Sequence, residues 1–299
     1  MRSRTKDHRI RIAILVLLHN WSKQQENLIN YLAEYFDLYI HVDKNTSIDI
    51  DKIRRHSVFV SKKYKVYWGS YYQICAILHL FQEAHANRYD RYILISGEDI
   101  PLKSGDDIRQ FFNGNSKEYF QYYPMPADFW HGNGGFDRVD FFYPNSLSRV
   151  DLGYIQKTLN RFLENSNEKI LIPLMKRYGK RPRLEVFYYG GSNWINITDT
   201  CVSTMLKWIS ENPWYLRKFR WTRRADEIFF QTCIINCAPN VEIENNALRY
   251  IDWHSGPERP RTLRINDLDN LKRSTCLFAR KVNYQIDEKI IKELYSLLV

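Results

Sequence analysis

RYILISGEDIPLK, residues 91–103, is the stretch that decides the fold. Its apolar run, residues 92–95, is continuous rather than alternating, which is typical of a strand that helices cover on both faces. The run ends at a serine and a glycine, and Glu98 and Asp99 follow. Because ligands in open α/β sheets bind beyond the carboxyl ends of the strands, these carboxylates are candidates for an active-site edge. The alternative is a helix-entry loop with solvated carboxylates, since short apolar runs are ambiguous.

Strand and helix patterns alternate on the N-terminal side of this stretch. Short apolar runs predict strands, and two serines that each stand three residues before a glutamine predict capped helix starts. This order predicts an α/β fold of the GT-A-like kind, with a mostly parallel central sheet flanked by helices. The predicted strands are residues 12–18, 38–42 and 58–60, and the capping pairs are Ser22 with Gln25 and Ser70 with Gln73.

The second half of the chain is predicted to be less regular. An aromatic stretch, residues 119–144, has the proline and glycine content of a loop-rich wall, and the polar, basic residues 164–183 are predicted to form a mobile loop. With no repeat and no clean linker, we expect one catalytic domain over residues 1–299. Helices are predicted over residues 103–112, 149–163, 199–210 and 225–235, and a strand over residues 191–197.

Composition narrows the class of protein. The chain has 299 residues, 44% of them hydrophobic and 15% aromatic, which indicates a globular protein rather than a disordered one. Its net charge is +10, with basic clusters at residues 176–183 and 217–224. Such charge suits an anionic ligand, an acidic polymer or an anionic membrane surface.

The cysteines and the N-terminus indicate a cytoplasmic protein. The five cysteines are scattered without a CxxC pair, so we expect reduced thiols and no zinc site. Only Cys233 and Cys237 have helical spacing. The basic start followed by an apolar run imitates a signal peptide, but the run is short and no small-residue cleavage site follows it. No stretch approaches the length of a membrane span.

Asp226 and Glu227 are candidates for catalysis, because they fall just inside a predicted helix start, where the helix dipole stabilises a carboxylate. The apolar residues 228–230 would anchor that helix, and a general base needs such a fixed position. The alternative is an ordinary acidic first turn.

The C-terminal segment carries cations that suit phosphate groups. Five residues, Arg261, Arg264, Arg273, Arg280 and Lys281, could grip phosphate oxygens, or they could form a solvated basic face. No Walker loop and no GxGxxG is present. Neither Asp-x-Asp sequence, at residues 49–51 and 267–269, directly follows a buried strand, which favours a diphosphate neutralised by side chains over one neutralised by a metal ion.

Eight motifs, in order over nearly the whole chain, resemble the core-2/I-branching β-1,6-N-acetylglucosaminyltransferases and peptide xylosyltransferases of glycosyltransferase family 14. The most specific in combination are the SGEDIPLK, DEIFFQT and FARK sequences. The motifs are LLHN (17–20), IHVDK (40–44), VYWGSYYQICA (66–76), LISGEDIPLK (94–103), GGSNWINIT (190–198), DEIFFQT (226–232), RYIDW (249–253) and LFARK (277–281).

The resemblance implies a GT-A-type fold, a UDP-sugar donor, an inverting mechanism, and no metal or other cofactor. It places the general base on Glu227 and the diphosphate-binding cations on Lys281 and on Arg261, with Arg264 as the alternative. Nucleoside contacts fall on His19, His41, Val42 and Asp43, and the sugar and acceptor site on Glu98, Asp99, Gly191, Ser192, Trp194, Asp226 and Trp253. Residues 1–115 would then form the nucleotide-binding half, and residues 116–299 the acceptor and diphosphate-binding half.

The sequence also departs from the family. Val282 follows the FARK sequence where the family commonly has phenylalanine, and neither a signal anchor nor a luminal disulfide pattern is found. We therefore expect a bacterial-type enzyme of surface polysaccharide synthesis that uses a glycan acceptor, such as a lipid-linked one, at the inner membrane face. N-acetylglucosamine is the expected sugar and xylose the alternative. A non-catalytic polyanion-binding or nucleic-acid-binding protein is the rival class, although the ordered motifs favour no nucleic acid as partner.

Overall fold

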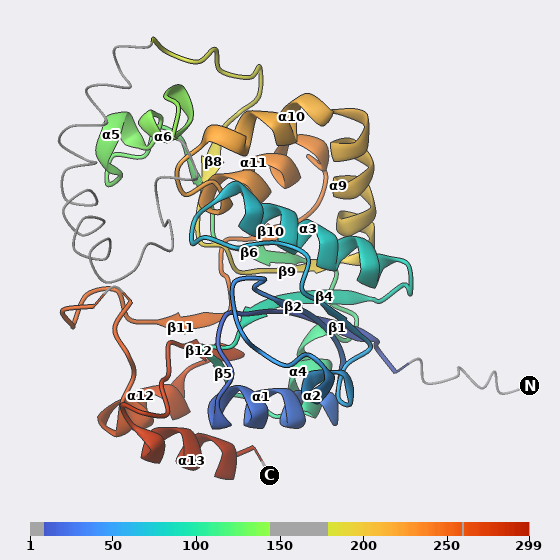
Figure 1. Cartoon of the computed structure of the whole chain (residues 1–299), viewed down its shortest axis with the longest axis vertical. Helices are drawn as coiled ribbons and strands as arrows, with labels where there is room; N and C mark the ends of the chain where they lie inside the picture. Colours follow the sequence, from blue (N-terminus) through green and yellow to red (C-terminus); the bar gives the residue numbers. More distant parts are fainter. Residues whose placement is uncertain (1–8, 144–178, 259, 299) are drawn as a thin grey trace, which may run out of the picture.

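The computed structural model describes residues 9–143, 179–258 and 260–298. A central sheet has the strand order β10-β6-β9-β4-β1-β2-β3 (Figure 1). Strands β1 to β4 are mutually parallel, and β9 runs antiparallel to both β4 and β6. The strands are β1 Ile12–Leu18, β2 Asp37–Val42, β3 Phe59–Ser61, β4 Arg91–Ser96, β6 Glu118–Phe120, β9 Ile195–Thr198 and β10 Ile243–Glu244.

Helices pack on both faces of this sheet because its central strands are apolar on both faces. On β1, Ala13 and Leu15 pack in one cluster with side chains of α3, α9 and α11, whereas Ile14 and Val16 pack in a second cluster with side chains of α1, α2 and α4. The predicted α/β fold, with a mostly parallel central sheet flanked by helices, is thereby confirmed. The helices are α1 Lys23–Ala33, α2 Asp51–Arg54, α3 Tyr71–His85, α4 Gly105–Phe112, α9 Asp199–Glu211 and α11 Asp226–Cys237.

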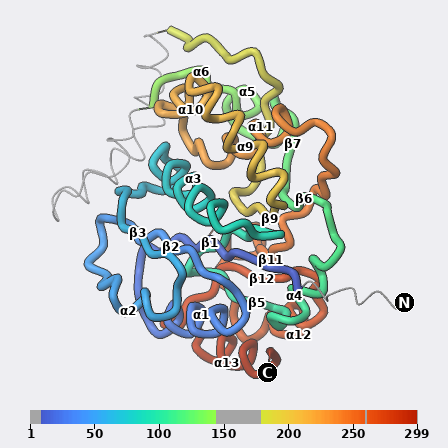
Figure 2. Tube along the Cα trace, turned by 90° about the vertical axis from the view of Figure 1, so that its right-hand side faces the viewer, coloured from blue at the N-terminus to red at the C-terminus, as the bar shows by residue number. Residues whose placement is uncertain are grey.

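A second, three-stranded sheet adjoins the carboxyl end of β4. It has the order β11-β12-β5, and β5 follows β4 after only two residues. Figures 1 and 2 both place this sheet beside α12 and α13, at the end of the molecule away from α9 and α10. Its elements are β5 Asp99–Pro101, β11 Arg249–Ile251 and β12 Phe278–Arg280, with η4 Ile265–Asp267, α12 Leu268–Arg273 and α13 Glu288–Ser296.

Shorter elements complete the described part of the chain. A small sheet pairs β7 with β8, and short helices lie in the aromatic stretch and before α11. The aromatic stretch is thus loop-rich, as predicted. These elements are β7 Tyr123–Pro124, β8 Tyr189–Gly190, α5 His131–Gly134, α6 Asp137–Asp140, α10 Pro213–Lys218 and η3 Phe219–Trp221.

Three local predictions meet different outcomes. The predicted strand over residues 191–197 is confirmed only in its C-terminal part, because β9 begins at Ile195. β8 ends at Gly190, and the residues between the two strands turn toward α11. Both capped helix starts are where they were predicted, but neither is a capping box. The Ser22 hydroxyl instead donates to Gln25, and Ser70 makes no capping bond. The predicted helix over residues 149–163, and most of the predicted loop over residues 164–183, lie outside the described residues.

Candidate active site

Asp99 joins the two sheets. It is buried, and its Oδ2 accepts hydrogen bonds from the backbone N–H and the hydroxyl of Ser96, both at 2.7 Å. The guanidinium groups of Arg249 and Arg280 lie 3.9 and 3.7 Å from its carboxylate. A carboxylate paired in this way holds β5, β11 and β12 together at the end of β4.

Glu98 points to a more open position at the same edge. Its carboxylate lies 3.3 Å from the guanidinium of Arg280 and 3.7 Å from the imidazole of His19, which follows β1. The Arg280 guanidinium also stacks on the ring of Trp194, 4.1 Å from its centroid. Four residues from the ends of β1, β4 and β12 and the start of β9 therefore meet here, as an active-site edge requires.

His41, Val42 and Asp43 hold the loop that follows β2. The His41 side chain is buried and its Nε2 accepts the backbone N–H of Tyr64 at 3.1 Å. Burial, reinforced by the charge of His79, lowers the pKa of His41 to about 4, so the imidazole is neutral. Asp43 Oδ1 accepts from the backbone N–H of Val66 at 3.0 Å. The side chains of His41 and Asp43 thus hold the backbone of residues 64–66 beside the end of β2.

Glu227 and Asp226, at the start of α11, have different environments. The carboxylate of Glu227 accepts a 2.6 Å ion-paired hydrogen bond from Arg138 of α6, and a quarter of its side chain is exposed. Asp226 is buried and accepts from the Gln73 amide of α3 at 2.9 Å. Burial, followed by the charge of Glu227, raises the pKa of Asp226 to about 7. One carboxylate therefore faces the site while the other anchors the helix start.

The 191–194 loop links Glu227 to the edge that holds Arg280. The backbone N–H of Gly191 donates to the Glu227 carbonyl at 2.8 Å, and the Trp194 ring stacks against the Arg280 guanidinium. A Cβ built on Gly191 would lie 1.9 Å from the Gln121 carbonyl oxygen, so only glycine fits this approach. Several buried polar atoms here make no hydrogen bond within the described chain, namely Ser192 Oγ, both amide atoms of Asn193, Arg280 Nη1 and Asp226 Oδ1.

Such unpaired atoms are costly unless water or another polar group satisfies them.

The predicted diphosphate cations differ in how they are engaged. Arg261 is held by two carboxylates, that of Asp252 at 2.9 Å and that of Asp267 through two bonds at 2.7 and 2.9 Å. Lys281 pairs with Glu258 at 3.2 Å, and more than half of the Glu258 side chain is exposed. Arg264 is exposed. Lys281 is therefore held less firmly than Arg261, which braces the loop that contains the exposed Trp253.

Some functional candidates are not apparent from sequence patterns. Arg138 lies in a glycine-rich and aromatic stretch with no motif, and the sequence offers no signal for its pairing with Glu227. Arg280 stands in the FARK sequence, next to the predicted Lys281, but its contacts with Glu98 and Trp194 depend on β12 lying beside β5. In the part of the chain that the structure describes, no three His, Cys, Asp or Glu side chains gather as metal ligands would.

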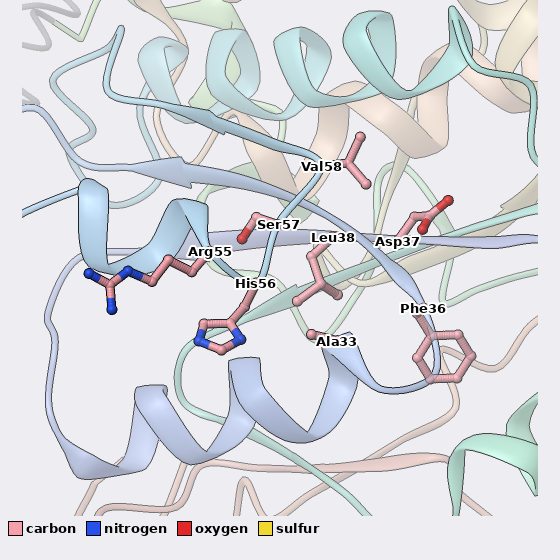
Figure 3. A pocket seen from close by; sticks show the side chains of 8 residues that line it. All are labelled: Ala33, Phe36, Asp37, Leu38, Arg55, His56, Ser57 and Val58. Carbon is pink, nitrogen blue, oxygen red and sulfur yellow. The ribbon is translucent and has the colours of Figure 1, made fainter.

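A shallow hollow of about 300 Å³ lies elsewhere, around the amino end of β2 (Figure 3). Its lining includes Leu38, Arg55 and His56, and it stands at the opposite end of β2 from His41 to Asp43. It shares no residue with the site described above. Within the described residues, no helix combines the length and apolarity needed to cross a membrane.

Comparison with known proteins identifies the family of this chain. The model of the Core-2/I-Branching enzyme family matches residues 20–272. Searching curated proteins gives no match. Among solved structures, the chain is similar to two of Staphylococcus aureus TarS. One has 17% identity, a TM-score of 0.29 and coverage of 37% of this chain and 21% of that chain. The other, of residues 1–349, has 12% identity, a TM-score of 0.38 and coverage of 79% and 58%.

A third similar structure is a putative nucleotide-diphospho-sugar transferase from Desulfovibrio desulfuricans G20, with 15% identity and a TM-score of 0.25. The match covers 37% of this chain and 57% of that one. This chain thus spans less than two thirds of each of the three solved chains.

Proposed function

This chain belongs to the Core-2/I-branching enzyme family, and we propose that it is a glycosyltransferase that moves a sugar from a UDP-sugar to a hydroxyl group of a glycan acceptor. The observation that supports this most is the position of Glu227. Its carboxylate is partly exposed, paired with Arg138 and fixed at the first turn of a buried helix. A general base needs this combination of access and fixed position.

In the proposed reaction, Glu227 removes the proton of the acceptor hydroxyl while that oxygen bonds to the anomeric carbon. The bond from the anomeric carbon to UDP breaks in the same step, so the configuration inverts. The departing diphosphate gains negative charge, and cations placed beside it lower the barrier. Lys281 supplies this charge by exchanging Glu258 for a phosphate oxygen, and Arg264 and Arg261 are the additional candidates.

The sugar of the donor is proposed to occupy the interior formed by the 191–194 loop, Glu98 and Arg280. The unpaired polar atoms of Ser192 and Asn193 support a ligand with many hydroxyl groups. We propose N-acetylglucosamine as the transferred sugar, with xylose as the second candidate. A lipid-linked glycan would bring the acceptor to an anionic membrane face, which the net charge of +10 favours.

We also propose that transfer needs no metal ion, because side-chain cations take the place of Mg²⁺ or Mn²⁺ at the diphosphate. Purified protein is incubated with a panel of UDP-sugars and glycan acceptors, and UDP release is measured with EDTA, with Mn²⁺ and with neither. The proposal predicts release from one UDP-sugar at the same rate in all three conditions. Loss of activity in EDTA with recovery in Mn²⁺ would contradict the metal-independent mechanism, and no response to any UDP-sugar would contradict the function itself.

A further inference from the structure

An exposed aromatic and cationic surface lies directly beside the proposed general base. Trp68, in the turn before α3, leaves 62% of its surface exposed. The guanidinium of Arg224 lies over this indole ring, 5.0 Å from its centroid. Arg224 is only three positions before Glu227 in the chain. We call Trp68 and Arg224 together the Trp68 platform.

Backbone contacts fix the Trp68 platform to the catalytic helix. The backbone N–H of Ala225 donates to the Gly69 carbonyl at 3.0 Å. A Cβ built on Gly69 would lie 3.1 Å from the Arg224 Cα, and Gly69 has a φ of +70°. Arg224 itself has a φ of 47°, which is unfavourable for a residue with a side chain. The glycine adopts its positive φ without strain, so the strained residue is Arg224, and such strain persists only where the surrounding structure holds the residue in place.

The charge beside the platform is positive. Burial, and then the charges of Arg224 and Arg223, lower the pKa of Arg138, while Glu227 raises it. The Arg138 guanidinium is paired with Glu227, whereas the Arg224 guanidinium lies over the Trp68 ring and makes no ion pair with a carboxylate of the described residues. The Arg224 charge therefore favours an anionic group beside Trp68.

Further exposed rings include Trp221, three positions before Arg224 in the chain. Trp221 and Phe142 are 38% and 40% exposed and pack edge to face with their centroids 6.4 Å apart. The Arg220 guanidinium lies 5.6 Å from the centroid of the Trp221 ring. Exposed rings that alternate with guanidinium groups suit an extended ligand with flat apolar faces and negative charges.

We propose that the Trp68 platform binds the acceptor, and that the acceptor is an acidic carbohydrate. The apolar face of one sugar ring packs on the Trp68 indole, and a carboxylate or phosphate of the same or the next sugar pairs with Arg224. The reacting hydroxyl then lies toward Glu227. This inference depends on the proposed function for the role of acceptor, but the binding of an acidic carbohydrate stands on the platform alone.

Binding is tested directly by calorimetry, with UDP present at saturation. The ligands are a galacturonate oligomer, a phosphorylated mannose oligomer, a neutral galactose oligomer of the same length, polyglutamate and a single-stranded DNA oligomer. The first two separate carboxylate from phosphate as the recognised anion. We expect one of them to bind at least about tenfold more tightly than the neutral oligomer and polyglutamate, because recognition needs both the ring and the charge.

Variants then localise the binding. Trp68→Ala and Arg224→Gln should each weaken the acidic oligomer about tenfold while the UDP-induced thermal shift stays unchanged. Phe187→Ala is the aromatic control, since its side chain is 79% exposed on another surface segment. Arg88→Gln is the charge control, because Arg88 also has a positive φ, of 52°, and is exposed. Neither control should change the affinity.

Several outcomes would overturn the inference. Equal binding of neutral and acidic oligomers, equal binding of polyglutamate, or preference for DNA would each exclude an acidic carbohydrate as the ligand. Unchanged affinity of the Trp68→Ala protein for the acidic oligomer would show that the Trp68 platform is not the binding site. If UDP-sugar turnover persists in any of these cases, the proposed function remains supported. If the acidic oligomer binds at the Trp68 platform but no UDP-sugar is turned over, the proposed function is contradicted and the carbohydrate site is retained.

Discussion

The guanidinium of Arg138 lies 2.6 Å from the carboxylate of Glu227, although the two residues are 89 positions apart in the chain. Arg138 comes from the short helix α6, and its guanidinium also stacks on the Trp130 ring, 4.1 Å from the centroid. Because the arginine is held on a second side by this ring, it fixes the direction in which the carboxylate points. The aromatic stretch thereby becomes part of the active site.

Removing Arg138 should lower turnover more than it lowers donor binding. In Arg138→Ala the carboxylate of Glu227 loses its fixed orientation, and a misplaced base costs about 10- to 100-fold in kcat. The UDP affinity should change less than about threefold, since the Arg138 side chain contacts Glu227 and Trp130 rather than the proposed diphosphate cations. Arg138→Lys should recover part of kcat. Equal losses of kcat and UDP affinity would indicate a general structural role instead.

Asp226 should make the folded state less stable as the pH rises. Its folded pKa of about 7 lies above the ordinary value of 3.8, so between these values the folded protein keeps a proton that the unfolded chain has released. The free energy of unfolding should therefore fall between about pH 4 and pH 7, by at most about 1.4 kcal/mol per pH unit.

Asp226→Asn removes this dependence and keeps the bond from Gln73 to a side-chain oxygen. Urea unfolding of both proteins at a series of pH values measures the difference. Burial also raises the pKa of Glu118, but that residue is present in both proteins and cancels. A stability difference between the two proteins that does not change from pH 4 to pH 7 would contradict the assignment.

The sequence patterns predict the parallel strands β1 to β4 well because these strands are short, apolar and separated by helices with clear periodicity, whereas β6 and β10 were not predicted. The strand over residues 12–18 has the predicted bounds, and the central strand differs by one residue at each end. The 191–194 loop was not predicted, since its apolar and β-branched neighbours extend the strand pattern across it. Its turn is imposed by the close approach of Gly191 to Gln121, a contact 70 positions away.

The candidate site likewise combines residues that sequence motifs identify with contacts that only the folded chain brings together. Motif residues such as Glu98, Glu227 and Lys281 lie at the carboxyl edge of the sheet or on elements beside it. Arg261 illustrates what a motif cannot express. Its charge suggests a phosphate ligand, but its partners Asp252 and Asp267 become visible only once β11 and η4 are placed together.

Lys281 and Arg261 should therefore respond differently to substitution. Lys281→Ala should weaken UDP binding about tenfold with little change in stability, because its carboxylate partner Glu258 is exposed. Arg261→Ala should lower the free energy of unfolding by about 1–3 kcal/mol, since it leaves the carboxylates of Asp252 and Asp267 without their cation.

Calorimetric UDP titration and urea unfolding of both variants give the two quantities, and Arg264→Ala provides the comparison with an exposed cation in the same loop. A Lys281→Ala protein with unchanged UDP affinity would remove this residue from the diphosphate site. A fully stable Arg261→Ala protein would show that Arg261 does not brace the loop.

The most direct test of the account compares wild type with Glu227→Gln, a substitution that keeps the size and polarity of the side chain but removes its basicity. UDP affinity is measured by calorimetry, and turnover by UDP release in the presence of the best donor and acceptor. The account predicts UDP affinity close to that of wild type with kcat lower by about 100-fold or more. Turnover close to that of wild type would contradict the assignment of Glu227 as the general base.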